Sequence, residues 1–369
     1  MQKMVKGKFD FSIFLITIIL ALFGCVMVYS ASYYRATIKL GQPAYYFIKQ
    51  VEGVVLGLLA MLFMANFNFQ RLERVKVPLV VVTLVLLLCV FLPKPIGIEL
   101  NGARRWVNLG ITTMQPSELC KITVVVLLSS YFAKNRERLS TWTGGVIPAF
   151  VISAVMCIPI MLQPNLSMVL CIMIITFIML FACGASKTHL LILCVLGVAA
   201  VAVLIIIEPY RLKRMFVYLD PWSDTQGDSW QLIQSFYAIG SGGLFGKGLG
   251  MSQQKLLFLP MEESDFIFSI IAEELGLVGV FCVIAAYLFL IWRGMRVALT
   301  CPNAFGSNLA MGITTMIAVQ VAINIGVVTG SIPPTGQTLP FISAGTSSLM
   351  LFMGSIGILL NVSRYSTPA

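Results

Sequence analysis

The sequence predicts an all-α integral membrane protein with ten transmembrane helices, both termini in the cytoplasm and one long extracytoplasmic loop between helices 7 and 8. Of the 369 residues, 58% are hydrophobic and only 11% are charged, whereas about a quarter of the residues of ordinary globular chains are charged. Apolar runs of membrane-spanning length recur along the chain, and most lysines and arginines lie in the short segments between them. So few charges cannot cover a water-facing surface, which excludes a soluble enzyme.

The spans follow from the length of these runs, because about 20 apolar residues cross a hydrocarbon core of about 30 Å. The first run follows three lysines as a signal peptide would, but its length and the later spans favour an uncleaved helix. Residues 139–186 carry no charge for 48 residues, and Gln163-Pro164-Asn165 divides them into two spans. The charge-free stretch 297–363 is broken around 330–340. The predicted spans are residues 11–29, 46–65, 77–92, 114–133, 145–162, 166–183, 188–207, 266–292, 308–329 and 341–361.

The basic residues of the short loops set the orientation. A cytoplasmic N-terminus places 13 lysines and arginines inside and six outside, as expected when cytoplasmic loops are the more basic ones. This positive charge is spread between apolar runs, without a basic arm or dense stripe, so we expect no nucleic-acid partner. The nine cysteines lie mainly in apolar stretches without a C-x-x-C pair, and we interpret them as small hydrophobic residues.

The long outer segment, residues 208–265, is the predicted functional loop. It holds seven of the fifteen acidic residues, and loops of this length are typically functional or disordered. Its aromatic residues argue against disorder, and Trp230–Ile239 reads as a short amphipathic helix at the membrane interface. Six glycines follow within Gly240–Gly250. They are either turns that allow close backbone packing or a backbone that approaches a ligand phosphate.

Asp265 is the sharpest catalytic candidate. It stands where the polar end of this loop gives way to the apolar run that begins at Phe266. One interpretation is a helix N-cap. The other is a carboxylate at the membrane surface whose proton affinity is raised by apolar surroundings, as a general base requires.

Two further sets of charges are candidate site residues. Glu118 and Lys121 lie one helical turn apart inside a predicted span, where charges default to a functional hypothesis; the alternative is a structural salt bridge. Arg104 and Arg105 precede Trp106 at the outer face. They could bind lipid headgroups, or a ligand phosphate through the planar guanidinium fork.

An ordered set of short motifs carries a family resemblance. The motifs include Asn101-Gly-Ala-Arg-Arg-Trp-Val, Gln115-Pro-Ser-Glu118, Gln163-Pro164, the glycine-rich segment with Ser252-Gln-Gln-Lys255, Asp265-Phe-Ile-Phe, Glu273-Glu-Leu-Gly276 and Leu339-Pro-Phe-Ile-Ser343. In this order the chain resembles the shape, elongation, division and sporulation (SEDS) family, the FtsW, RodA and SpoVE polymerases, and is closer to the FtsW and SpoVE branch. The motifs cover roughly residues 100–345.

The resemblance implies a peptidoglycan glycosyltransferase of the bacterial cytoplasmic membrane that polymerises lipid II for division, cell shape or sporulation. It implies a partnership with a class B penicillin-binding protein and with the division or elongation machinery. The family's essential aspartate maps onto Asp265 and its fourth-helix glutamate onto Glu118, and a divalent cation, Mg or Mn, is expected. The predicted catalytic residues are therefore Asp265 and Glu118, and the predicted substrate-binding cations are Arg104, Arg105, Arg211, Arg214, Lys255 and Lys121.

The chain departs from the family pattern at four positions: Asn165, Met261, Ala344 and Thr346. Two other functions stay open beside the polymerase. A lipid II flippase would use the intramembrane Glu118–Lys121 pair and the proline-broken spans. An inactive scaffold for a penicillin-binding protein would follow if the changes at Met261 and Asn165 had silenced catalysis.

Overall fold

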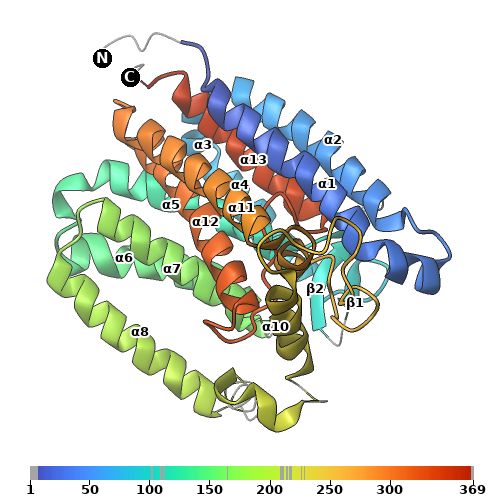
Figure 1. The fold of residues 1–369 in the computed structure, drawn as a ribbon. Helices are drawn as coiled ribbons and strands as arrows, with labels where there is room; N and C mark the ends of the chain where they lie inside the picture. Colours follow the sequence, from blue (N-terminus) through green and yellow to red (C-terminus); the bar gives the residue numbers. More distant parts are fainter. Residues whose placement is uncertain are drawn as a thin grey trace.

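The fold is a bundle of apolar helices, seen here in a computed structural model (Figure 1). The structure describes residues 7–366 except 101–102, 109, 111–112, 164, 208–211, 213–214, 216–217, 226 and 228. The α-helices are α1 (Phe11–Leu40), α2 (Tyr45–Asn66), α3 (Phe69–Arg74), α4 (Lys76–Cys89), α5 (Pro116–Lys134), α6 (Ile147–Leu162), α7 (Leu166–Ala182), α8 (Lys187–Ile207), α10 (Trp230–Gly242), α11 (Ile267–Thr300), α12 (Ala304–Val328) and α13 (Thr346–Ser363). Short helical turns η1 (Arg136–Arg138), η2 (Trp142–Val146) and η3 (Pro221–Asp224) lie between them.

Eight of the described helices are long and apolar enough to cross a membrane, counting η2 and α6 as one. The helices α4 and α7 are shorter apolar helices. The first helix extends to Leu40, well beyond the predicted end at residue 29, and the helix predicted to end at 292 continues to Thr300. Asp10 caps the start of α1 through hydrogen bonds from two backbone amides, and Gly41 ends it in the left-handed conformation.

A small antiparallel sheet corrects the all-α prediction. Strands β1 (Gly97–Leu100), β2 (Ala103–Asn108) and β3 (Thr113–Met114) pair in the order β1-β2-β3. In the first pair Leu100 lies opposite Ala103, so only two residues, Asn101-Gly102 in the sequence, join the strands. Asn-Gly is a strong sequence signal for a two-residue β-hairpin. This local signal explains why a hairpin forms here in a chain that is otherwise mostly helical.

The centre of the bundle consists of α5, α12 and α13. In the most apolar stretch of each, 78%, 72% and 78% of the residues are buried, against 6% for α8. Figure 1 shows α12 in the middle of the bundle, with α1 and α2 along one side of α13. Polar groups carried by α5 and α12 are therefore enclosed by protein.

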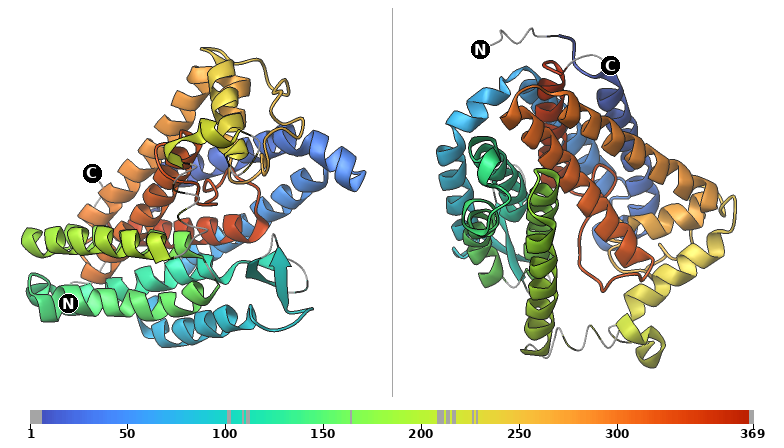
Figure 2. Two further views of the ribbon diagram at one scale, coloured as in Figure 1. Left: turned by 90° about the horizontal axis from the view of Figure 1, so that it is seen from below. Right: turned by 90° about the vertical axis from the view of Figure 1, so that its left-hand side faces the viewer.

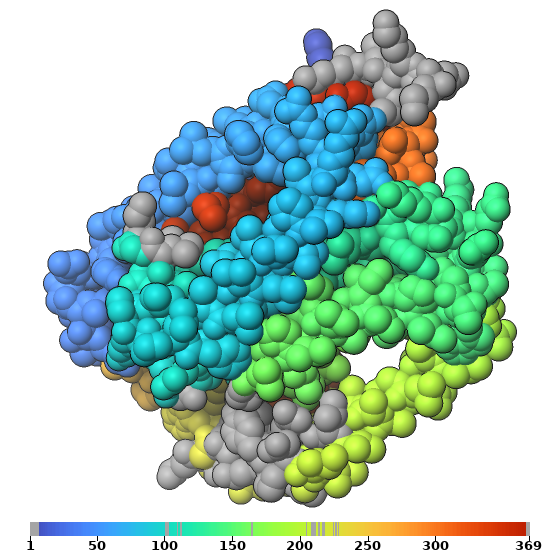
Figure 3. Space-filling model, turned by 180° about the vertical axis from the view of Figure 1, so that it is seen from behind, coloured from blue at the N-terminus to red at the C-terminus, as the bar shows by residue number. Residues whose placement is uncertain are grey.

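The helix α8 stands apart from this bundle. It contacts its neighbours near its start, where the His189 ring centroid lies 4.4 Å from that of Trp142. Beyond this point most of its described residues are exposed. The two views in Figure 2 show α8 running along the side of the bundle, and the space-filling view in Figure 3 shows an opening between α8 and the rest of the molecule.

The two ends of the bundle carry different features. The chain termini meet at one end, where Gly7 N donates to Arg364 O at 2.7 Å and Asp10 N donates to Ser363 Oγ at 2.9 Å. The hairpin, α10 and the loop before α11 lie toward the other end (Figure 1). The predicted outer residues thus gather away from the termini.

Candidate functional site

Asp265 lies in the last turn of the loop that leads into α11. The helix begins at Ile267, and Phe266 is its N-cap without a side-chain capping hydrogen bond. The interpretation of Asp265 as the N-cap of this helix is therefore wrong.

The Asp265 carboxylate faces a tight turn between α12 and α13. A Cβ atom on Gly336 would lie 3.3 Å from Asp265 Oδ2, and Gly336 has a φ of +64°, a backbone conformation that glycine adopts most readily. Burial, and then the nearby Glu263 carboxylate, raises the pKa of Asp265 from 3.8 to about 6, while a hydrogen bond with Ser264 opposes the rise. A carboxylate with this pKa is ionised at neutral pH and can still accept a proton.

The backbone on both sides of Asp265 is fixed by polar contacts. Asn324 on α12 donates its side-chain amide to Asp265 O at 2.9 Å and to Gln337 O at 2.7 Å. Ser343 Oγ donates to Ser264 O at 2.6 Å, and the Ala344 amide donates to Glu263 O at 2.9 Å. The loop before α11 is thereby joined to the segment before α13.

Glu118 and Lys121 form the predicted ion pair. Pro116 starts α5, a helix position that needs no amide donor, and this puts Glu118 in the first turn. Lys121 Nζ lies 2.8 Å from Glu118 Oε2, and both side chains are buried. Lys121 also donates to Gln320 Oε1 and lies 5.1 Å from the centroid of the Phe352 ring.

A chain of side-chain amides connects this pair with Asp265. Gln320, which accepts from Lys121, donates to Thr338 O at 3.0 Å. Asn324 lies one helical turn further along α12 and binds Gln337 O and Asp265 O. The two centres that the sequence marked separately therefore share one support, made by α12 and the segment around Thr338.

Arg35 ties the same loop to α1. Its Nε lies 3.3 Å from Glu262 Oε1 and its Nη1 lies 3.1 Å from Glu263 Oε2. Burial, then Glu263, raises the pKa of Glu262 from 4.5 to about 7, and Arg35 is among the groups that oppose this rise. Two carboxylates close to Asp265 thus share one arginine.

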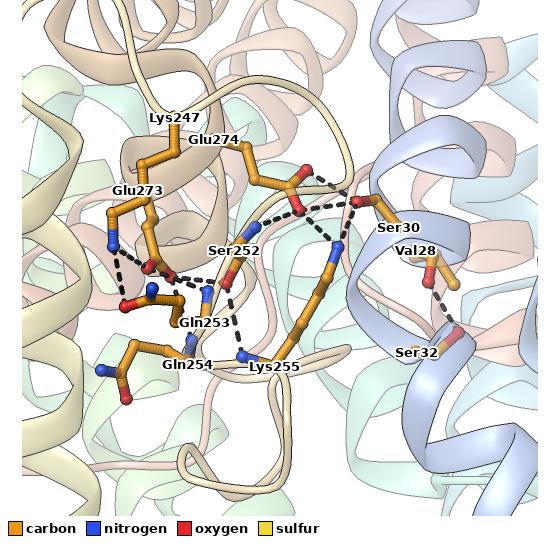
Figure 4. Close-up of polar contacts among 10 residues, drawn as sticks. All are labelled: Val28, Ser30, Ser32, Lys247, Ser252, Gln253, Gln254, Lys255, Glu273 and Glu274. Atoms are coloured by element: carbon orange, nitrogen blue, oxygen red, sulfur yellow. Dashed lines mark hydrogen bonds and ion pairs between the residues drawn. The ribbon is translucent and has the colours of Figure 1, made fainter.

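Lys255 occupies a buried network around α11 (Figure 4). Its Nζ lies 2.8 Å from Glu274 Oε1 and 3.3 Å from Ser30 Oγ on α1. The adjacent Glu273 binds Lys247 at 2.7 Å and accepts hydrogen bonds from the loop beside Ser252. Lys255 therefore has a structural partner within the protein, and its predicted contact with phosphate stays a prediction.

The hairpin carries Arg104 and Arg105. Arg104 is exposed and pairs with Glu99 at 3.1 Å. Arg105 is partly buried and its Nε donates to Gln163 O, the C-cap of α6, at 3.3 Å. The predicted site residues Arg211 and Arg214, and Pro164 of the motif, lie outside the described residues.

The four departures from the family pattern leave the support of Asp265 in place. Asn165 accepts a hydrogen bond from Met168 N and caps α7, a task that asparagine and aspartate share. Ala344 contributes through its backbone amide, and Thr346 Oγ1 donates to Lys49 O at 3.0 Å. Met261 adopts a positive φ of 55°, which is uncommon for a residue with a side chain.

Several residues that hold the site had been missed. Gln320 and Asn324 are amides spaced one turn apart inside a charge-free stretch, and this spacing was an available signal. In the sequence Arg35 is one of the basic residues outside the predicted spans, and nothing there distinguishes it from the others. Ser30 carried no signal, because a serine within an apolar run can also bond to its own helix.

Comparisons with known proteins agree with the resemblance. The family model for FtsW, RodA and SpoVE, described as cell cycle protein, matches residues 10–368. Stage V sporulation protein E of Bacillus subtilis is 40% identical over 98% of both chains. A probable peptidoglycan glycosyltransferase FtsW of Geobacter metallireducens is 39% identical over 96% of this chain and 95% of its own. These relatives confirm the predicted closeness to the FtsW and SpoVE branch.

Solved structures show the same fold. A chain of a structure described as a peptidoglycan synthase complex that coordinates polymerization and crosslinking superposes with a TM-score of 0.76, at 29% identity over 98% of this chain and 99% of its own. The rod shape determining protein RodA of Thermus thermophilus gives a TM-score of 0.68 at 27% identity, covering 98% of each chain.

Proposed function

This chain belongs to the FtsW, RodA and SpoVE family of cell cycle proteins, and we propose that it polymerises lipid II into glycan strands at the outer face of the bacterial cytoplasmic membrane. The observation that carries the proposal is Asp265, a carboxylate of raised pKa held between the loop before α11 and the segment before α13. The names of the relatives support a peptidoglycan glycosyltransferase.

The proposed topology has ten spans with both termini cytoplasmic. The eight long apolar helices and the two shorter ones, α4 and α7, supply ten segments. The meeting of both termini at one end of the bundle supports placing them on one side of the membrane (Figure 1). Residues 208–265 then form the extracytoplasmic functional loop, and Asp265 lies on the side where glycan strands are made.

Asp265 acts as the general base in this proposal. The hydroxyl oxygen of the acceptor sugar attacks the anomeric carbon of the donor and forms the new glycosidic bond. The bond from that carbon to the pyrophosphate oxygen breaks, and its electron pair leaves with the polyprenyl pyrophosphate. The hydroxyl proton passes to an oxygen of Asp265, and the supports on its backbone keep this oxygen in place.

Positive charge must stabilise the departing pyrophosphate. Arg104 and Arg105 are the described candidates with an approach from outside, since the first is exposed and the second is partly buried on β2.

We assign Lys121 and Glu118 to holding the support beside Asp265, because Lys121 is enclosed by Glu118, Gln320 and Phe352. Arg211 and Arg214 stay predicted phosphate partners.

A divalent cation would find unpartnered side-chain oxygens on the segments that contact Asp265. Asn324 Oδ1, Gln337 Oε1 and Thr335 Oγ1 are buried without a hydrogen-bond partner, and Mg or Mn prefers such hard oxygen ligands. Among the described residues no group of three or more His, Cys, Asp or Glu side chains converges, so Asp265 would supply the carboxylate. Bound there, the cation would stabilise charge on phosphate oxygens.

A lipid tail needs a path between membrane helices. The opening between α8 and the bundle offers one (Figure 3), and the described residues of α8 beyond Leu190 are apolar and mostly exposed, as contact with an acyl chain requires. The same opening favours the second candidate function, lipid II flipping.

A class B penicillin-binding protein is the proposed partner, supported by the similarity to a chain of a peptidoglycan synthase complex.

One reconstitution separates the three functions. Purified protein in liposomes is given fluorescent lipid II, with and without the partner, and both strand formation and transbilayer movement are measured. The proposal expects strands. Movement without strands would assign the flippase, and neither product in the presence of the partner would assign the scaffold.

A further inference from the structure

The transmembrane helix α11 is broken near its start, and the glycine-rich segment fills the break. Gly276 has φ 65° and ψ −165°, outside the helical region. A Cβ atom there would lie 2.3 Å from Gly246 N and 2.6 Å from Leu244 O. Only glycine permits this approach, so the break and the glycine-rich segment fit one another.

Backbone hydrogen bonds join the two across the break. The amides of Leu277 and Val278 donate to Gly243 O at 2.9 Å and Leu244 O at 3.1 Å. In the opposite direction, the amides of Lys247 and Gly248 each donate at 3.0 Å to the carbonyls of Glu273 and Glu274. These four bonds satisfy groups that the broken helix would otherwise leave unpaired.

The break lies within the depth of the membrane. At the other end of α11, Trp292 has the guanidinium groups of Arg293 and Arg296 at 5.6 and 5.2 Å from its ring, an arrangement typical of the membrane interface. The sixteen residues from Leu277 to Trp292 rise about 24 Å, which is less than the hydrocarbon thickness of about 30 Å. The break therefore lies inside the hydrocarbon region, in the leaflet opposite to Trp292. Backbone groups at this depth need hydrogen-bond partners within the protein.

The side chains of the glycine-rich segment continue the apolar surface of α11. Leu244 and Phe245 are 62% and 82% exposed, and Phe281 on α11 is 63% exposed. Leu249 and Met251 are exposed as well. The turn is thus apolar on its outside and hydrogen-bonded on its inside.

We propose that residues 243–251 form a re-entrant turn whose Leu244 and Phe245 side chains lie among the acyl chains of the outer leaflet. The occupant of this surface is lipid, because the turn is bonded directly to a transmembrane helix and extends the lipid-facing surface of that helix. The turn anchors the loop that ends at Asp265, through the Glu273 and Glu274 network that begins at Lys247 (Figure 4). This inference rests on the topology proposed above, with both termini cytoplasmic, and it does not depend on the proposed reaction.

Spin-label accessibility tests the inference without an activity assay. The exposed Cys194 and Cys282 are replaced by serine, and Phe245→Cys is labelled in phosphatidylglycerol–phosphatidylethanolamine liposomes. Collisions with oxygen, which concentrates in lipid, and with a water-soluble nickel chelate are then measured. Phe281→Cys is the lipid reference and Glu99→Cys, on the exposed hairpin, is the water reference. If Phe245→Cys fails to fold, Leu249→Cys replaces it.

The spin label on Phe245→Cys is expected to collide with oxygen as often as the label on Phe281→Cys does. Unlike the label on Glu99→Cys, it should collide rarely with the nickel chelate. A label that collides with nickel as at Glu99 would overturn the inference, as would a label shielded from both agents in the protein alone. If both collisions are lost only when the penicillin-binding protein is added, the surface belongs to that partner and lipid is not its occupant in the complex.

Discussion

Asn324 Nδ2 lies 2.9 Å from the backbone carbonyl oxygen of Asp265, and the same amide group lies 2.7 Å from the carbonyl oxygen of Gln337. One side chain from the centre of the bundle therefore fixes both of the segments that meet at the Asp265 carboxylate. Asn324 is almost completely buried, so its hydrogen bonds are shielded from bulk water. The position of the proposed base, Asp265, therefore depends on the core of the protein as well as on the loop.

Replacing Asn324 by alanine is expected to lower kcat for strand synthesis about tenfold to a hundredfold with little change in KM. A buried acceptor left without a donor costs about 1–3 kcal/mol, and the loss displaces the base without removing a substrate contact. Asn324→Asp should be worse, because it puts a carboxylate against two carbonyls. Steady-state kinetics on lipid II checks both.

Asn361 supplies the matched control for this prediction. It is a buried asparagine that donates to Ala65 O at 2.8 Å and accepts from Phe69 N at 3.0 Å. Asn361→Ala should lower Tm to a similar extent and leave the pH profile unchanged. Equal losses of kcat in the two variants at equal Tm would remove the positioning role from Asn324.

Removing one member of the Glu118–Lys121 pair is expected to destabilise the protein by about 3–5 kcal/mol, because the remaining charge stays buried without its partner. The double variant Glu118→Gln with Lys121→Met should recover most of the Tm. Thermal unfolding in detergent measures this. Full polymerase activity in the recovered double variant would show that the pair has no catalytic role.

The pH dependence of strand synthesis should have an acid limb near pH 6. Asp265 must be ionised to accept a proton, so activity falls as the pH drops through its pKa of about 6. Glu263→Gln removes a neighbouring negative charge that raises this pKa, and the limb should move to lower pH. In Glu262→Gln we expect a smaller movement, because Glu262 is not among the groups that shift the pKa of Asp265. If Glu263→Gln left the acid limb of the pH profile unmoved, the assignment of that limb to Asp265 would be contradicted.

Lys255→Met distinguishes a structural role from phosphate binding. The buried Glu274 would lose its ion pair, so we expect a loss of about 3–5 kcal/mol in stability and partial recovery in Lys255→Met with Glu274→Gln. Limited proteolysis of the loop and Tm measure the effect. A raised KM for lipid II at unchanged Tm would instead assign Lys255 to the substrate.

Much of the fold could be predicted because lipid as a solvent constrains composition strongly. The apolar runs located most helices to within a few residues, and Gln163-Pro164-Asn165 did separate α6 from α7. The extension of α1 to Leu40 was missed because Arg35 and Lys39 suggested a loop. Arg35 instead reaches two carboxylates of another loop, a contact across 227 and 228 positions of sequence that no local pattern reveals. The hairpin was missed although Asn101-Gly102 signalled it.

The site was predictable in its parts and not in its assembly. Charges inside an apolar run or at its start stand out, so Glu118, Lys121 and Asp265 could be selected. Their common support could not, since Gln320 and Asn324 are uncharged and act mainly through backbone carbonyls of segments distant in the sequence. The glycines of 240–250 were consistent with either close packing or phosphate binding, and their fit against Gly276 supports close packing.

The most direct test of the whole account is strand synthesis from lipid II by Asp265→Asn in liposomes, beside Glu262→Gln as a folded control. The asparagine keeps the shape of the side chain and cannot act as a base at neutral pH. We predict an unchanged Tm and no glycan strands from Asp265→Asn, with strands still formed by Glu262→Gln. Strands of normal length made at the normal rate by Asp265→Asn would contradict the account.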